Sequence, residues 1–260
     1  MSSFDQDLPE GYSIPILYED REILIVNKPW DIRIDGDSEV TVEKLVRQKN
    51  LSQGSVPLLG LGREMDAFRL CNQLDYATSG VLVLGLTSKG AGNCNKLFCA
   101  RKTEKIYLAV GQKSGLDVSQ GAGVDVGQGA AGLDWEPQIV KEKISEVPNS
   151  FCMQIDPLNG KECETEITPI KPVEMKDGRK GILFRVRILT GRRHQIRLHL
   201  KHIGYPIMGD ATYNDHENNQ IEREESRMML HAWKLLLPYP KGSVAVEADP
   251  SEFFSHTIMA

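Results

Sequence analysis

Runs of apolar residues, separated by charged or glycine-containing turns, mark the predicted strands of this chain. Residues 14–18 and 22–26 form two such runs, joined by the charged turn 19–21. Residues 80–86 are a continuous apolar run, which is typical of a strand that is buried on both faces. Further strands are predicted at residues 105–110, 150–155, 164–170 and 183–189.

Helices are predicted at three places along the chain. The first covers residues 41–50, with Thr41 as its N-cap and with Val42, Leu45 and Val46 on one apolar face. The second covers residues 89–100. The third covers residues 194–202, and Gly204 is expected to end it in the left-handed conformation.

Two stripes of side chains run along the third predicted helix. The apolar stripe is expected to face the core and comprises Ile196, Leu200 and Ile203. The basic stripe is expected to form one charged face and comprises Arg193, Arg197 and Lys201.

These elements lack a regular strand–helix–strand alternation, and the sequence contains no internal repeat. It therefore predicts an α+β fold, with a mixed, largely antiparallel sheet flanked by helices. Residues 56–66 are expected to form a glycine-rich loop, and residues 113–136 an irregular insertion. Gly121-Ala-Gly-Val-Asp-Val-Gly127 is not expected to bind a dinucleotide, because its spacing departs from GxGxxG.

The composition is that of a soluble globular protein, with 40% hydrophobic and 26% charged residues in 260. Apolar runs stay well below the ~20 residues that span a bilayer. The first 11 residues are acidic and polar, unlike a secretion signal or a transit peptide. We therefore expect an intracellular protein, cytoplasmic or nuclear, without a membrane partner; an organelle is left open.

The cysteines are odd in number and scattered: Cys71, Cys94, Cys99, Cys152 and Cys163. The sequence contains no CxxC pair, which disfavours both a zinc site and a disulfide framework. We expect small, partly buried free thiols and no bound metal.

The distribution of charge is more informative than its sum. The formal net charge is −5, which taken alone argues mildly against nucleic-acid binding. Residues 179–201, however, contain eight Lys or Arg and no Asp or Glu. Such a basic segment on an acidic protein is compatible with local binding of a polyanion.

Asp75 is the first candidate for chemistry. It lies in Asn72-Gln-Leu-Asp-Tyr-Ala-Thr-Ser-Gly80, where a loop leads into the predicted buried strand. Such a position can hold a carboxylate firmly and leave one oxygen accessible. The alternative is an aspartate that caps a turn, and the spacing alone favours this alternative.

The segment Gly191-Arg-Arg-His-Gln-Ile-Arg-Leu-His199 is the second candidate. Arginines at the start of a helix can bind phosphate oxygens, whereas the alternative is a solvated basic face. Gln195 adds a side chain that can form two hydrogen bonds. His194 and His199 diverge by roughly 140° around a helix, so they are not expected to share a metal.

Tyr107, in the predicted strand at residues 105–110, is the third candidate. A tyrosine between apolar neighbours in a strand usually packs against the next strand. The functional alternative is an aromatic ring that stacks on a nucleobase.

Four blocks of sequence carry a family resemblance. They are Tyr18 to Pro29, Gln73-Leu-Asp-Tyr-Ala-Thr-Ser-Gly80, Leu189 to Arg197 with its continuation to Tyr213, and Leu230-His-Ala232. In this order they resemble the first strand pair, the RLDxxTSG motif, the GRTHQIRxH…GxPIxGDxxY block and the LHA motif of RluA-type pseudouridine synthases. Within that group they are most similar to the animal RNA pseudouridylate synthase domain-containing proteins, over roughly residues 14–240.

The resemblance implies an enzyme that isomerises specific uridines in RNA to pseudouridine. It implies a pseudouridine synthase fold with one catalytic domain at residues 14–245, an N-terminal extension at 1–13, a C-terminal tail at 246–260 and no separate RNA-binding domain. The partner would be tRNA, rRNA or mRNA, and we expect a monomer. Since the reaction neither gains nor loses atoms or electrons, no cofactor is expected.

The resemblance also assigns roles to single residues. Asp75 matches the aspartate that attacks the sugar C1′ or promotes a glycal intermediate. Arg197 matches the basic residue that pairs with this aspartate and keeps it ionised, and Tyr107 matches the tyrosine that stacks on the uracil. Leu230 is expected in the apolar floor of the pocket. The expected substrate-binding residues are Gln73, Arg192, Arg193, His194 and Gln195.

The chain departs from the family pattern at three positions. Gln73 stands where bacterial members have the arginine that helps to displace the flipped base, and Arg69 is a possible replacement. Asn72 replaces a common histidine, and Asp31 replaces a glycine. Gln73 keeps a second hypothesis open, a catalytically silent protein that binds or folds RNA. A third hypothesis is an enzyme for a small molecule, which predicts no salt-dependent affinity for RNA.

Overall fold

The computed structural model describes residues 12–52, 68–113, 137–214, 227–240 and 242–258. The predicted loop at 56–66 and the candidate glycine motif at 121–127 lie outside these residues, as does almost all of the predicted insertion at 113–136. The chain divides into two compact units. Unit 1 comprises Met1–Thr103 and Lys234–Ala248, and unit 2 comprises Glu104–Trp233 and Asp249–Ala260.

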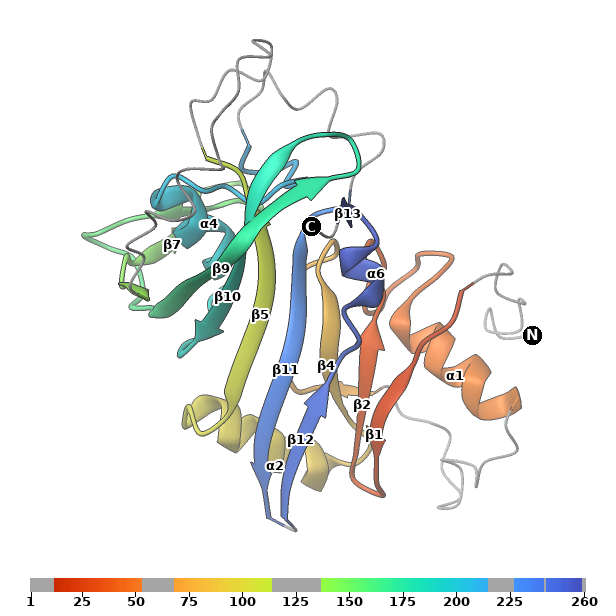
Figure 1. Cartoon of the computed structure of the whole chain (residues 1–260). Coiled ribbons are helices and arrows are strands. Elements are labelled where there is room, and N and C mark those ends of the chain that lie inside the picture. The colour runs from red at the N-terminus through yellow and green to blue at the C-terminus, as the bar shows by residue number, and fades with distance from the viewer. Residues whose placement is uncertain (1–11, 53–67, 114–136, 215–226, 241, 259–260) are drawn as a thin grey trace. The chain divides into compact units, whose positions relative to one another are not determined.

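The described residues of unit 1 form antiparallel strands and the helices α1 and α2 (Figure 1). Its strands are β1 (Ile16–Glu19), β2 (Ile23–Lys28), β3 (Arg69–Leu70), β4 (Ser79–Gly85), β12 (Gly242–Glu247) and the second half of β11 (Leu230–Tyr239). Its helices are α1 (Val42–Ser52) and α2 (Ser88–Cys99). Strand β2 pairs with β1 on one side and with β4 on the other, and β12 pairs with the half of β11 that belongs to this unit.

The helices of unit 1 begin where the sequence predicts. Thr41 caps α1, since its Oγ1 accepts a hydrogen bond from Lys44 N at 3.2 Å. The predicted apolar face of α1 is buried. Thr87 caps α2 in the same way, with Gly90 N donating to its Oγ1 at 3.0 Å. Both predicted helices are confirmed.

The core of unit 1 forms where α2 packs against β2 and β4. It consists of buried apolar residues from both strands, from α2 and from β11 and β12, among them Ile23, Ile25, Val81, Val83, Ala91, Cys94, Leu235 and Leu237. All seven residues of β4 are buried, as its uninterrupted apolar sequence predicts. Gly85 allows this close packing, because a Cβ there would lie 2.5 Å from Ala91 Cβ.

Unit 2 is built on an antiparallel sheet in the order β5-β10-β9-β13, with β6 paired to β9. Its strands are β5 (Glu104–Gly111), β6 (Gln138–Val140), β9 (Thr165–Met175), β10 (Lys180–Ile188) and β13 (Thr257–Ile258). Strands β7 (Ile144–Glu146) and β8 (Met153–Ile155) form a separate two-stranded sheet. The helices are α4 (Gln195–His202) and α6 (Ser251–Phe254). Figure 1 shows β9 and β10 as a long, curved hairpin, and Gly178 turns it with a φ of 85°.

The predicted α+β class is confirmed, because every strand pair named above is antiparallel and helices accompany the sheets. The predicted strand at 150–155 is wrong in its first half. There Asn149 has a φ of 58° and Ser150 N donates to Val147 O, so the chain turns before β8 begins. Gly204 ends α4 with a φ of 82°, as predicted.

The basic stripe of α4 is exposed only at its two ends. Arg193 and Lys201 are exposed, but Arg197 is only 6% exposed. The described helices include none that is long and apolar enough to cross a membrane. The five cysteines are free thiols, as predicted.

Candidate active site

A buried lysine anchors the turn that carries Asp75. Lys28, at the end of β2, is fully buried, and its Nζ donates hydrogen bonds to three main-chain carbonyls. The acceptors are Pro29 O at 2.9 Å, Tyr76 O at 2.8 Å and Thr78 O at 2.9 Å. Tyr76 directly follows Asp75, and Thr78 lies three residues after it. The ammonium group therefore fixes the backbone on the C-terminal side of the half-buried aspartate.

The turn itself is closed by the main chain, since Thr78 N donates to Asp75 O at 3.1 Å. On its N-terminal side, the Asn72 side chain continues the pairing of β4. Its Oδ1 accepts from Val83 N at 2.7 Å and its Nδ2 donates to Val81 O at 3.4 Å. Asn72, in place of the family's common histidine, thus has a structural role, and the Asp75 turn is held at both ends.

Gln73 and Arg69 differ in how they are placed. Gln73 is exposed, two residues before Asp75. Arg69 pairs with Gly85, at the far end of β4 from Ser79. Six residue steps along the strand separate these two ends, which is ~20 Å. The structure therefore does not support Arg69 as the replacement for the family's arginine.

Two of the candidate residues of unit 2 lie on strands. Tyr107 is 8% exposed in β5 and pairs with Val186 of β10. Lys105, two residues earlier on the same strand, has its pKa lowered to about 8, because burial disfavours the charged ammonium. Leu230 is buried at the start of β11.

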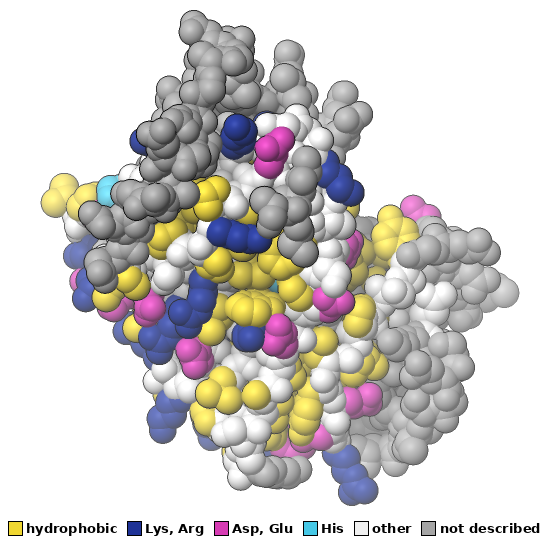
Figure 2. Space-filling model, in the orientation of Figure 1, with side chains coloured by type: hydrophobic (Ala, Val, Ile, Leu, Met, Phe, Trp, Pro, Cys, Tyr) yellow, Lys and Arg dark blue, Asp and Glu magenta, His cyan; other side chains and the backbone are white. Residues whose placement is uncertain are grey.

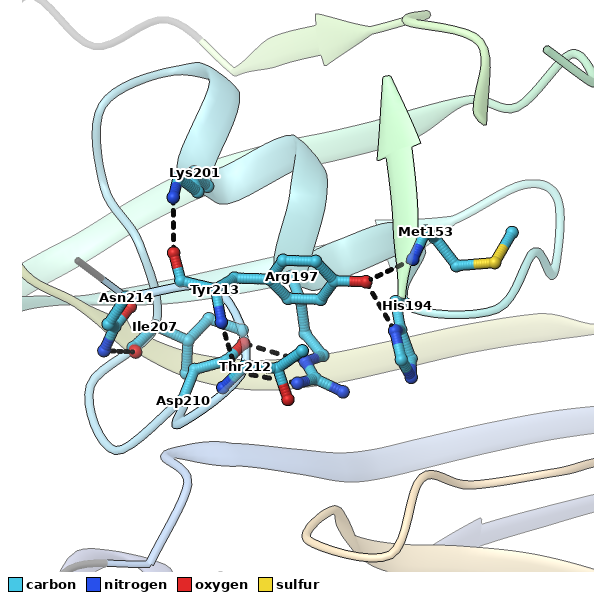
Figure 3. Close-up of polar contacts among 9 residues, drawn as sticks. All are labelled: Met153, His194, Arg197, Lys201, Ile207, Asp210, Thr212, Tyr213 and Asn214. Atoms are coloured by element: carbon cyan, nitrogen blue, oxygen red, sulfur yellow. Dashed lines mark hydrogen bonds and ion pairs between the residues drawn. The ribbon is translucent and has the colours of Figure 1, made fainter. Parts of the chain in front are cut away.

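Arg197 is held by a carboxylate that sequence analysis did not assign to it (Figure 3). Its Nε donates to Asp210 Oδ2 at 2.8 Å, and its Nη2 donates to Oδ1 at 2.7 Å. The Arg197 and Asp210 side chains are 7% and 1% exposed. The guanidinium also lies 4.8 Å from the centre of the Tyr213 ring. This bidentate pair fixes the plane of the guanidinium and uses two of its five N–H donors.

Asp210 and Tyr213 extend this cluster. Asp210 Oδ1 also accepts from Thr212 N at 3.0 Å and from Tyr213 N at 3.2 Å. The Tyr213 hydroxyl accepts from Met153 N at 2.8 Å and lies 2.6 Å from His194 Nδ1. The Tyr213 hydroxyl therefore joins β8 to the residue that precedes α4, and the His194 tautomer decides which partner donates in its bond to Nδ1. Burial is the main cause that raises the pKa of Tyr213.

Gln195 has a structural role in the loop before α4. Its Oε1 accepts from Thr190 Oγ1 at 2.8 Å and from Arg192 N at 3.0 Å. Its Nε2 donates to Glu164 O at 3.0 Å and to Thr165 Oγ1 at 2.8 Å. These four bonds use the full hydrogen-bonding capacity of a buried amide. The contacts of Gln195 therefore support a role in positioning this loop more than the predicted role in binding RNA.

The predicted basic segment at residues 179–201 is partly neutralised by acids. Arg179 pairs with Asp177 at 2.8 Å, and Arg187 pairs with Glu166 at 3.3 Å. On the face shown in Figure 2, described Lys and Arg side chains lie beside Asp and Glu and among apolar side chains. The segment is therefore less basic on the folded surface than in the sequence, because Asp177 lies two residues before Arg179 and Glu166 of β9 pairs with Arg187.

Arg192 and Arg193, by contrast, are exposed at the start of α4. Arg192 Nε donates to Glu162 O at 3.2 Å. The Arg193 guanidinium lies 5.5 Å from the centre of the Phe151 ring and donates to Phe151 O. Both side chains are thus anchored to the protein and keep donors for a phosphate group.

His199 is a core residue. It is fully buried, with Nδ1 2.8 Å from Thr165 Oγ1 and Nε2 2.9 Å from Glu142 O. Burial is the main cause that lowers its pKa. Among the described residues, the structure contains no group of three or more His, Cys, Asp or Glu that could hold a metal ion.

Comparison with known proteins places these features in a family. The sequence model of RNA pseudouridylate synthase matches residues 22–202. RNA pseudouridylate synthase domain-containing protein 1 of Danio rerio is 33% identical over 241 residues, which cover 92% of this chain and 75% of that protein. The tRNA pseudouridine synthase C of Vibrio cholerae is 27% identical and matches over 92% of each chain. The solved structure of human RNA Pseudouridylate Synthase Domain Containing 1 has a TM-score of 0.70 and 26% identity, covering 94% of this chain and 87% of that chain.

Proposed function

Because the chain belongs to the RNA pseudouridylate synthase family, a family of isomerases, we propose that it converts specific uridines in RNA to pseudouridine with Asp75 as nucleophile. The observation that carries the proposal is the family match over residues 22–202, which includes the Asp75 segment. The geometry of unit 1 supports it, since Lys28 and Asn72 hold the turn of Asp75 at both ends. A firmly held carboxylate is what nucleophilic catalysis requires.

The reaction breaks the bond between ribose C1′ and uracil N1 and forms a bond between C1′ and C5. The C5 proton leaves and N1 gains a proton, so the product has the same atoms as the substrate. In our proposal Asp75 acts on the sugar carbon while the uracil turns. The target base must be flipped out or lie in a loop to be reached. The isomerisation transfers no electrons between molecules, so the proposal includes no cofactor.

Arg197 and Tyr107 are the other proposed catalytic residues, with the roles that the family resemblance implies. The Asp210 pair supports this role for Arg197, because a guanidinium of fixed plane and permanent charge can hold a carboxylate in its ionised form. The exposed Arg192 and Arg193 are proposed to bind phosphates of the RNA. We propose that residues 14–245, which include both units, act as one catalytic domain.

The test compares the wild type with Asp75→Asn on total cellular RNA, by mapping pseudouridine at single-base resolution. We expect new pseudouridines with the wild type and none with Asp75→Asn. Asp37→Asn, which makes the same change at an exposed aspartate of unit 1, is the control and should act like the wild type. Equal modification by the wild type and Asp75→Asn would overturn the assignment of Asp75.

Gln73, which stands where bacterial members of the family have an arginine, favours one alternative function, a catalytically silent protein that binds or folds RNA. RNA containing 5-fluorouridine separates the two functions. An active synthase gives a covalent or rearranged 5-fluorouridine product, whereas the silent protein returns the RNA unchanged. Because one relative is a tRNA pseudouridine synthase C, tRNA is the first class of RNA to test.

A further inference from the structure

An exposed tyrosine directly follows the proposed nucleophile. The Tyr76 side chain is 52% exposed, although most large apolar and aromatic side chains of this unit are buried. Its backbone is not free to move with it, because Tyr76 O accepts a hydrogen bond from the buried Lys28 Nζ at 2.8 Å. The ring is thus an exposed surface on a fixed support.

An arginine lies against this ring. The Arg33 guanidinium carbon is 5.7 Å from the centre of the Tyr76 ring, within the range of a cation–π interaction. Arg33 is exposed, and its backbone is also fixed, because Val42 N at the start of α1 donates to Arg33 O at 2.9 Å. Two segments far apart in sequence therefore present a flat aromatic ring and a flat cation together.

The surroundings fit a base better than a phosphate. Partial burial raises the pKa of the Tyr76 phenol, and the nearby Asp31 and Tyr12 raise it further, so the ring is uncharged at neutral pH. The charge of Arg33 has the opposite effect and lowers the pKa of the Tyr76 phenol. The Asp31 carboxylate would repel a phosphate placed directly on the ring. An aromatic ring stacks on any nucleobase, since every base has a π-face.

We propose that Tyr76 and Arg33 form a stacking platform for the unpaired base next to the target uridine. The proposal rests on the proposed function, because it takes Asp75 as the residue that acts on that uridine. Consecutive Cα atoms are about 3.8 Å apart, so a base on Tyr76 belongs to a nucleotide beside the one at Asp75. Arg33 supports the ring and binds the adjoining phosphate. The platform would make the enzyme prefer uridines with an unpaired neighbour.

The first experiment measures binding of the full chain to a fluorescein-labelled single-stranded oligouridine by fluorescence anisotropy. Tyr76→Ala should raise Kd about 5- to 30-fold, which is about 1–2 kcal/mol at 1.4 kcal/mol per tenfold change. Tyr76→Phe keeps the ring and should stay within about twofold of the wild type. Arg33→Ala should raise Kd and reduce the salt dependence of log Kd by about one ion. Arg21→Ala removes the same charge at the other end of β2 and is the matched control.

The second experiment uses a uridine that the wild type modifies. Because stacking acts on bound substrate and transition state alike, Tyr76→Ala should raise KM and leave kcat nearly unchanged. Retention of wild-type Kd and KM by Tyr76→Ala, with unchanged melting, would overturn the platform. So would a Tyr76→Phe variant as weak as Tyr76→Ala. If Tyr76→Ala does not fold, the comparison of Arg33→Ala with Arg21→Ala decides.

The outcomes also separate the platform from the proposed function. If the wild type makes no pseudouridine but Tyr76→Ala and Arg33→Ala weaken RNA binding, the stacking of an unpaired base on Tyr76 stands, whereas its position beside a target uridine falls together with the catalytic proposal. If the wild type makes pseudouridine and neither variant changes Kd or KM, the platform alone falls. A wild type that does not bind RNA overturns both.

Discussion

The buried Arg197–Asp210 pair allows a sharp prediction for Asp210→Asn. The substitution keeps the size of the side chain and one acceptor oxygen, which can still serve Thr212 N and Tyr213 N. It removes the negative charge and replaces the other oxygen by an amide nitrogen, whose protons would face those of the guanidinium. Arg197 thus loses a charged partner at a site that is 7% exposed.

The magnitude follows from burial. Removal of one partner of a buried ion pair costs about 3–5 kcal/mol, because the remaining charge stays out of water. One retained hydrogen bond places the expected loss in the free energy of unfolding at about 2–4 kcal/mol. For a chain of this length, each kcal/mol lowers the melting temperature by roughly 2–4 °C, so Tm should fall by roughly 4–15 °C. Pseudouridine formation should fall at least about tenfold below the level expected from folded protein, because an Arg197 of wrong orientation lowers kcat.

Thermal unfolding of Asp210→Asn and Asp177→Asn, followed by circular dichroism, is the assay. Asp177 binds Arg179 at 2.8 Å, the same kind of contact, but the Asp177 side chain is 48% exposed. An exposed pair contributes about 0.2–1 kcal/mol, so Asp177→Asn should lower Tm by less than about 4 °C. Equal shifts in the two variants, or a shift below about 2 °C for Asp210→Asn, would refute the reasoning from burial.

Three further predictions concern other parts of the chain. Lys28→Met leaves three carbonyls without their hydrogen-bond donor. Pseudouridine formation should therefore fall at least about tenfold, and the free energy of unfolding should fall by about 1–3 kcal/mol. Wild-type activity of this variant on the mapped RNA would contradict the prediction. Burial lowers the pKa of His199 in the folded chain. Below about pH 6.5 the unfolded chain therefore binds more protons than the folded chain. Stability then decreases as the pH decreases, by up to about 1.4 kcal/mol per pH unit for this group. His199→Gln should flatten the decline of Tm below about pH 6.5, and an unchanged slope would show that other groups cause it. Within α2, Gly90→Ala should destabilise the protein by more than about 2 kcal/mol, because its Cβ would lie 2.1 Å from Glu22 O. Gly92→Ala has nothing within 4 Å of its Cβ and should stabilise the protein by about 0.5–1 kcal/mol. Melting curves with shifts of the same sign would refute this contrast.

Several local features were predictable from sequence because their causes lie within a few residues. Thr41 caps α1 through a hydrogen bond to a residue three positions along, and Gly204 ends α4 through its own backbone conformation. The burial of β4 follows from a run of apolar residues that has no polar face. Family membership was also readable, since four motif blocks in a fixed order are specific even at 33% identity.

The roles of individual polar residues were less predictable. Lys28 belongs to the first motif block, but its sequence position gives no sign that its Nζ meets carbonyls 48 and 50 residues later. Gln195 was expected to contact RNA, yet two of its four partners lie 30 and 31 residues earlier in the chain. A lysine or an amide has the same appearance in sequence whether it faces water or fills a buried network.

The sequence alone determined the α+β class, the cap of α1, the family and Asp75 as the candidate nucleophile. Tertiary structure decided which charges are neutralised and which side chains are held in place. Arg197 shows the difference, because helical periodicity predicted one charged face and the structure buries the Arg197 guanidinium against Asp210. Periodicity and capping depend on neighbours in the chain, whereas a buried ion pair depends on where folding brings an acid 13 residues away.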